Sequence, residues 1–322
     1  MAAGSKTVIY AALIGNGLIS ITKFTAAALT GSSAMLSEGV HSLVDTGNQV
    51  LLLYGIKRAS RPADARHPFG YGAEIYFWAF VVAILIFAVG AGVSIYEGIE
   101  KLRHPHPIAN PIINYVVLIL AMAFEAVAWW IAFRAFEETR GDMGWLEAVR
   151  TSKDPTIFTV LFEDTAAMLG LVVAFVGIFA AANLGVEWAD GAASVVIGFI
   201  LAGAALLLAI ETKGLLIGEA ASPEVEEEIR QIVAATPSIR ALNEIRTLHR
   251  GPQDVLLAIS VDFEDDLTSG DVERGVQTLE RTIRGRFPTI RRLFVEAQSE
   301  EGHRESQAAL RTEAAPPAAA GH

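Results

Sequence analysis

The chain has 322 residues, of which 52% are hydrophobic and 19% are charged, and its net charge is −11. It is too apolar for an ordinary soluble protein and too charged to lie within a membrane along its whole length. The absence of cysteine excludes disulfides and thiolate ligands, so a metal site would have to use imidazole and carboxylate groups. Acidic clusters at 224–228 and 262–266 argue against nucleic acid as a partner.

Long apolar stretches dominate the first two thirds of the chain. A membrane helix needs about 20 mostly apolar residues. Six stretches meet this length, at 7–29, 33–55, 73–98, 112–134, 156–183 and 189–212. We therefore predict an all-α transmembrane domain of six helices over residues 1–212, surrounded by membrane lipid.

Basic residues concentrate in two of the connectors. The connector between the second and third stretches carries Lys57, Arg58, Arg61 and Arg66. The connector between the fourth and fifth stretches carries Arg140, Arg150 and Lys153. The opposite side has only Lys101 and Arg103. By the positive-inside rule, we expect a multi-pass integral membrane protein with both termini in the cytoplasm.

The last third is charged and reads as a soluble domain. Ser222 followed by Pro223 predicts the start of a helix that runs to about 235. Alternating, branched residues predict strands at 241–249 and 254–263, followed by a helix at 269–286 and a strand at 292–296. The order α-β-β-α-β indicates a two-layer α/β domain over 213–299. The Ala/Pro/Glu-rich residues 300–322 are predicted to be a disordered tail.

Two of the predicted membrane helices carry ionisable residues. His41 and Asp45 lie four residues apart and so share one helix face. Asp164, on the fifth stretch, offers a third ligand, but its neighbour Glu163 points about 100° away, so we expect only one of the two to face the site. A charge at bilayer depth costs about 2.5–3.5 kcal/mol and persists when it is paired, hydrated or binding something. These residues therefore predict a cation site within the membrane.

Other charged residues in these stretches have several interpretations. Glu38 is either a cap or a residue at the mouth of the site. Glu125 is a fourth ligand, a proton relay or a partner for Lys23, and the sequence does not separate these roles. Asp190 is expected to cap the start of its own helix.

Several motifs resemble those of the cation diffusion facilitator family. Residues 33–49 (SAMLSEGVHSLVDTGNQ) resemble the family's second transmembrane helix, and residues 67–72 (HPFGYG) resemble the signature that follows it. Residues 245–252 (IRTLHRGP) and 286–288 (RFP) resemble its cytoplasmic domain. The resemblance covers almost all of the chain. It implies a homodimer, joined through the cytoplasmic domain, that exports divalent metals, mainly zinc, in exchange for protons.

The resemblance also implies a ligand set. His41 and Asp45 match the ligand pair of the second helix, and Asp164 matches the later ligand of the fifth helix. Val160 stands where relatives carry the earlier ligand, and it cannot bind metal. Residues 161–167 (LFEDTAA) resemble the branch that contains zinc transporter nine-type proteins. The shell would be completed by water or by Glu163, Glu125 or Asn48.

We thus expect a metal/proton antiporter that works by alternating access, located in a bacterial inner membrane, with divalent metal and protons as substrates and no cofactor. Zinc is the expected ion; manganese, iron and cobalt are alternatives because an oxygen-rich site tolerates harder ions. A non-transporting membrane scaffold or regulator, whose soluble domain recruits a partner, is the alternative that the missing ligand favours. No nucleophile–base set or phosphate-binding glycine loop indicates an enzyme. The positions that bind zinc in the cytoplasmic domain of some relatives hold Asn243, Ser260, Glu296 and Gln298, so we expect metal sensing there to be weak or absent.

Overall fold

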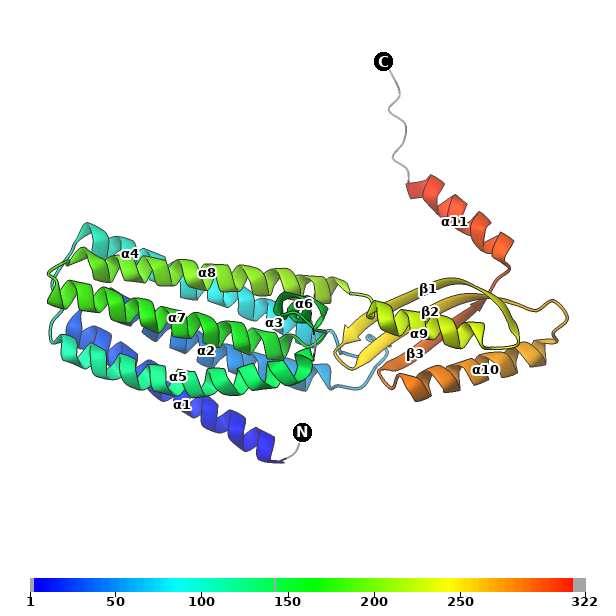
Figure 1. The fold of residues 1–322 in the computed structure, drawn as a ribbon, viewed down its shortest axis with the longest axis horizontal. Coiled ribbons are helices and arrows are strands. Elements are labelled where there is room, and N and C mark those ends of the chain that lie inside the picture. Colours follow the sequence, from blue (N-terminus) through cyan, green and yellow to red (C-terminus); the bar gives the residue numbers. More distant parts are fainter. Residues whose placement is uncertain (1–2, 142, 315–322) are drawn as a thin grey trace, which may run out of the picture. The chain divides into compact units, whose positions relative to one another are not determined.

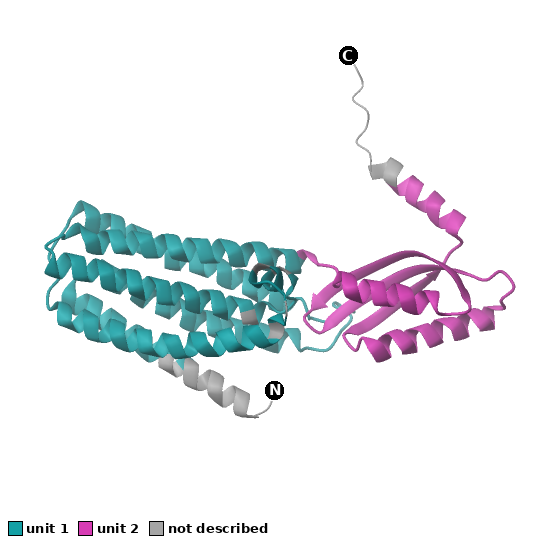
Figure 2. Ribbon diagram, in the orientation of Figure 1, with its two compact units in different colours: residues 1–216 teal, residues 217–322 magenta. Residues whose placement is uncertain are grey.

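The structure is a computed structural model that describes residues 3–141 and 143–314. The chain divides into two compact units, residues 1–216 and 217–322 (Figure 2). The boundary lies slightly later than the predicted 212, because the last long helix of the first unit continues to Ile217.

The first unit is a bundle of long helices (Figure 1). The elements are α1 (Ala3–Thr30), α2 (Ser33–Ala59), α3 (Glu74–Leu85), η1 (Ile86–Ala91), α4 (Gly92–Arg103), α5 (Pro111–Arg140), α6 (Trp145–Thr151), α7 (Pro155–Asn183) and α8 (Trp188–Ile217). The segments α3, η1 and α4 follow one another without a break, so the third predicted stretch is one long helix with a π-helical turn inside it. The short helix α6 was not predicted.

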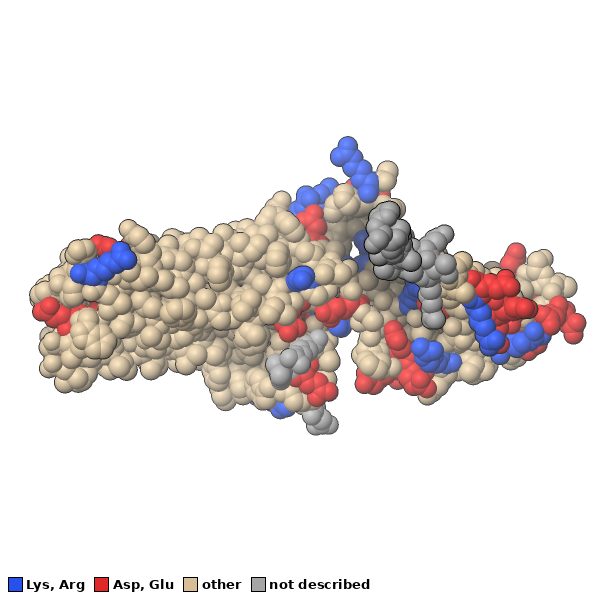
Figure 3. All heavy atoms as spheres, turned by 90° about the horizontal axis from the view of Figure 1, so that it is seen from above, with Lys and Arg blue, Asp and Glu red and all other residues tan. Residues whose placement is uncertain are grey.

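The bundle presents an apolar exterior. Ile112, Leu120 and Ile131 on α5 are each more than 60% exposed, and the face of the bundle seen in Figure 3 carries charged side chains mainly near its ends. Among the described residues, four helices are long and apolar enough to cross a membrane, at Glu74–Arg103, Pro111–Glu138, Phe158–Asn183 and Trp188–Ile217. The row of polar side chains on α2 lowers the mean hydropathy of that helix. Six spans therefore remain a prediction.

Glycines bring α4 and α8 into unusually close contact. A Cβ atom on Gly98 of α4 would lie 2.7 Å from the backbone nitrogen of Val195 on α8. A Cβ atom on Gly191 of α8 would lie 3.0 Å from the carbonyl oxygen of Gly98. Small residues at membrane helix interfaces allow backbones to approach in this way.

The second unit packs two helices on one face of a three-stranded sheet. Its elements are α9 (Pro223–Ala234), β1 (Ile239–Gly251), β2 (Asp254–Phe263), α10 (Ser269–Arg286) and β3 (Ile290–Ala297). β2 is the central strand, antiparallel to β1 and parallel to β3. Alternate residues of β2, such as Leu257 and Ile259, share a core with Ile229 of α9 and Ile283 of α10.

The predicted disordered tail is largely helical instead. Helix α11 spans Glu300–Ala314. Glu300 and Arg304 form an ion pair one helical turn apart, and the amide of Gln307 donates to Glu244 of β1 at 3.3 Å. Alanine has the highest helix propensity, and composition alone did not reveal these contacts. The remainder of the predicted tail, 315–322, lies outside the described residues.

Candidate metal centre

The start of α2 is fixed by a carboxylate from α8. Asp190 accepts hydrogen bonds from the hydroxyl of Ser32 at 2.6 Å and from the backbone nitrogens of Ser33 and Ala34 at 2.8 and 3.3 Å. Asp190 was expected to cap its own helix. It instead caps α2, because the free N–H groups at that helix start are buried and need an acceptor. This contact fixes the position of the helix that carries His41 and Asp45.

His41 and Asp45 lie together inside the bundle. His41 Nε2 is 3.5 Å from Asp45 Oδ2, and the two side chains are 2% and 11% exposed. Within the described part of the chain, neither ring nitrogen of His41 has a hydrogen-bond partner, nor does Asp45 Oδ1. Buried polar atoms are almost always bonded. This pair therefore has lone pairs available for a cation.

Helix α7 brings its acidic residues to the same region. Asn48 of α2 donates from its amide to Glu163 at 2.8 Å. The carboxylate of Asp45 interacts electrostatically with those of Glu163 and Asp164. Asp164 Oδ2 has no hydrogen-bond partner among the described residues. Both acids of α7 thus act on Asp45. Glu163 is also hydrogen-bonded to Asn48, whereas Asp164 keeps an unbonded oxygen.

Lys23 forms a second buried group beside the first. Its ammonium donates to Glu38 at 3.0 Å and to the hydroxyl of Ser42 at 2.9 Å, and both charged side chains are fully buried. Glu38 is therefore neither a cap nor a mouth residue. Glu125, which is 5% exposed, interacts electrostatically with Lys23, Glu38 and Asp45. The ion-pair partner of Lys23 is Glu38, which sequence reasoning did not identify because their contact joins two helices.

The donors do not form a closed shell. Among the described residues, no group of three or more His, Asp or Glu side chains lies close enough together to hold a metal ion. Imidazole and carboxylate groups nevertheless suit zinc and similar dications, and unbonded atoms of both kinds are present. A closed site would need His41, Asp45 and Asp164 to approach one another. These residues stay a predicted ligand set.

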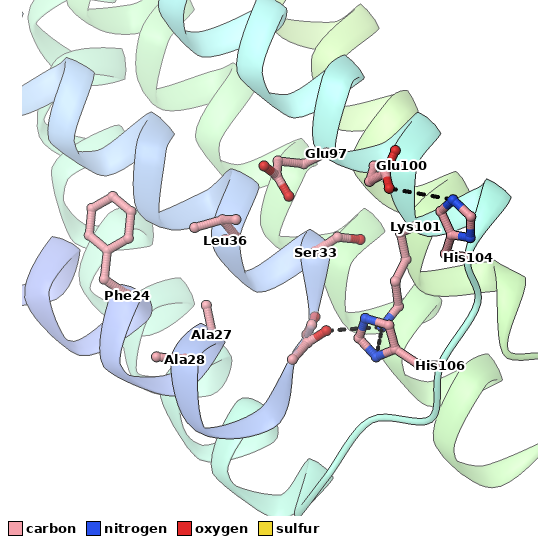
Figure 4. Close-up of a pocket in the computed structure, with 12 residues that line it drawn as sticks. Phe24, Ala27, Ala28, Ser33, Leu36, Glu97, Glu100, Lys101, His104 and His106 are labelled. Carbon is pink, nitrogen blue, oxygen red and sulfur yellow. Dashed lines mark hydrogen bonds and ion pairs between the residues drawn. The ribbon is translucent and has the colours of Figure 1, made fainter.

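A separate pocket of about 590 Å³ opens between α1, α2 and α4 (Figure 4). Phe24 and Leu36 contribute apolar walls, and charged residues from the end of α4 line the rest. Lys101 donates to the carbonyl of Gly31 at 3.0 Å and contacts the ring of His106 at 2.7 Å. None of the predicted ligands lines this pocket.

Polar side chains in the connector after α2 and in the sheet unit form hydrogen bonds within the chain. In the connector after α2, the hydroxyl of Tyr71 donates to Asp64 at 2.5 Å, and this bond, with the backbone N–H of His67, lowers the pKa of Asp64 to about 2. In the sheet unit, the amide of Asn243 donates to the carbonyl of Gln298 at 2.8 Å. The one histidine of the sheet, His249, lies on β1.

Comparison with known proteins shows the family to which this chain belongs. Residues 9–217 match the model described as the cation efflux transmembrane domain, so the match includes the whole candidate site. The chain belongs to the cation efflux family. This is a family of membrane transporters and not of enzymes, and the chain is an integral membrane protein.

Several members of the cation efflux family are similar to this chain over most of its length. The proton-coupled zinc antiporter SLC30A9, mitochondrial, is 32% identical in Xenopus laevis over 263 residues, which are 81% of this chain and 47% of that protein. The human protein of the same name is 31% identical and covered to 46%. The chain thus spans about half the length of these curated relatives. The cation-efflux pump FieF of Escherichia coli O127:H6 is 26% identical over 84% of this chain and 85% of its own length.

Two solved structures of MamM CTD variants are similar to about a quarter of this cation efflux protein. The nickel form of one variant of the MamM CTD is 18% identical, covering 24% of this chain and 98% of that one, with a TM-score of 0.23. The zinc form of another MamM CTD variant is 20% identical, covering 24% of this chain and 86% of that one, with the same TM-score.

Proposed function

We propose that this protein exports divalent cations, Zn²⁺ foremost, from the cytoplasm in exchange for protons. The observation that supports this most directly is the buried pair His41 and Asp45, whose unbonded nitrogen and oxygen atoms lie beside the acids of α7. A static scaffold would gain nothing from such unsatisfied polar atoms inside a membrane bundle. Relatives whose names specify zinc and proton coupling, together with the family match, support the same proposal.

Proton exchange follows from the charges of the proposed ligands. A dication held by neutral His41 and the carboxylates of Asp45 and Asp164 forms a neutral group. When the ion leaves, the two carboxylates repel each other in a poorly solvated site, and protonation relieves that repulsion. Metal release and proton uptake are then coupled by the site itself.

The proposed transport cycle requires six spans with both termini in the cytoplasm, as in a bacterial inner membrane. The ligands lie on α2 and α7, so alternating access moves these helices relative to their neighbours to expose the ion first to one side and then to the other. Two copies are proposed to associate through the sheet unit, in which Phe294 of the edge strand β3 is 53% exposed. Cross-linking of purified protein with and without residues 217–322 would test that association.

The test of transport is zinc uptake into proteoliposomes under an imposed proton gradient. Asp45→Asn should abolish the gradient-driven flux, because even residues behind the ligands contribute about 10–100-fold to metal affinity. Asp265→Asn, at a side chain 78% exposed in the sheet unit, is the matched control and should transport normally. Competition among zinc, manganese, cobalt and iron in the same assay identifies the ion. Full transport by Asp45→Asn would refute the proposed site.

A further inference from the structure

A lysine ammonium lies fully buried within the helical bundle. Lys23 of α1 has no exposed surface, and its ammonium donates to Glu38 and Ser42 of the adjacent helix α2. Placing an ammonium there is costly even when it is paired, and an ion pair of this kind adds little net stability over apolar side chains. In membrane proteins, a buried charge of this kind usually has a functional reason.

The lysine does not satisfy both carboxylate oxygens of Glu38. Glu38 Oε1 is buried and has no hydrogen-bond partner in the part of the chain that the structure describes. Glu125 of α5 interacts electrostatically with both Lys23 and Glu38. The backbone of α7 closes the third side, since a Cβ atom on Gly170 would collide with Glu38 Oε1. The carboxylate of Glu38 and the hydroxyl of Ser42 therefore contact a single positive charge, and the carboxylate of Glu125 acts on that charge electrostatically.

This group lies next to the proposed transport site. Glu38, His41 and Asp45 share one face of α2, and Glu38 lies about 10 Å from Asp45 along the helix axis. The charge of Lys23 acts on His41 as well. The ammonium thus occupies a cation position adjoining the place where the transported ion would bind.

We propose that Lys23 is a tethered cation that fills a second cation site formed by Glu38, Ser42 and Glu125. The ammonium neutralises Glu38 and keeps that carboxylate away from the transported ion. It thereby limits the bundle to one dication at a time, bound at His41, Asp45 and Asp164. This inference rests on the proposed function, because it assumes that those three residues bind the transported ion.

The test is zinc stoichiometry, measured by elemental analysis after equilibrium dialysis of the purified full chain in detergent. Lys23→Ala vacates the position and leaves Glu38 and Glu125 without a cation, so it should bind one zinc per chain more than wild type. The matched double variant Lys23→Ala/Glu38→Gln removes the carboxylate as well and should return to the wild-type value. If Lys23→Ala does not fold, Lys23→Gln keeps an amide beside Ser42 without the charge and should show the same gain.

A parallel measurement separates the two proposals. His41→Ala in the wild-type background should lose one zinc per chain. If it does so while Lys23→Ala and Lys23→Gln gain none, the tethered-cation inference is overturned and the transport site stands. If His41→Ala loses none, the transport site fails and the inference fails with it. A gain that persists in Lys23→Ala/Glu38→Gln also overturns the second site.

Discussion

Replacing Asp190 with alanine should destabilise the helical bundle by removing the acceptor at the start of α2. The backbone N–H groups of Ser33 and Ala34 are fixed by the helix and would lose their partner in a buried setting. Each unsatisfied buried donor costs about 1–3 kcal/mol, so the two together cost about 2–6 kcal/mol. The hydroxyl of Ser32 can turn to another acceptor and adds nothing to this sum. Lys101, 3.8 Å from Asp190, keeps its hydrogen bond to a backbone carbonyl.

The assay is reversible unfolding in mixed dodecyl-maltoside and SDS micelles, followed by tryptophan fluorescence. A loss of about 2 kcal/mol changes the ratio of folded to unfolded protein about thirtyfold. Glu100→Ala is the control: its side chain is 52% exposed, and surface changes usually stay within about 0.5 kcal/mol. Asp190→Asn retains one acceptor oxygen and should fall between them. Equal stability of Asp190→Ala and Glu100→Ala would refute the assignment of Asp190 as the cap of α2.

Three further predictions concern the parts outside the membrane. Tyr71→Phe should raise the pKa of Asp64 from about 2 toward the ordinary value near 3.9, as read by NMR titration. Because the folded-state pKa is depressed, the contribution of Asp64 to stability is complete above its unfolded pKa and is lost as pH falls toward 2; in Tyr71→Phe that contribution should be smaller, and its loss should be complete at a higher pH. Leu257→Ala, at a fully buried position of β2, should cost the sheet unit about 2–5 kcal/mol in denaturant unfolding. Thr268→Ala should cost about 1 kcal/mol, because the capping box with Asp271 at the start of α10 is lost; an unchanged melting curve would contradict that role.

Sequence periodicity identified most of the long helices and the approach of His41 to Asp45, because both depend on contacts within one helix. Contacts between helices could not be predicted in the same way. The ion pair of Lys23 with Glu38 depends on how α1 packs against α2, which composition and spacing do not specify.

Asp190 shows the same limit. Acidic residues do favour helix starts, and Asp190 lies near the start of α8. Its carboxylate, however, accepts hydrogen bonds from the start of α2. Likewise, the composition of residues 300–314 is typical of disorder, whereas contacts with β1 and a favourable helix propensity support α11. Local patterns therefore predicted the elements, and the errors arose where a distant segment supplied the partner.

The glycine contacts between α4 and α8 restrict how the bundle can move. Where the two backbones are in contact, neither helix can slide or rotate past the other without a steric clash. These two helices should therefore behave as one rigid body. The contact between α2 and α7 includes side-chain hydrogen bonds such as that of Asn48 with Glu163, which can break and re-form. Conformational change at the proposed ligands can therefore proceed at the contact between α2 and α7, with α4 and α8 as the fixed reference.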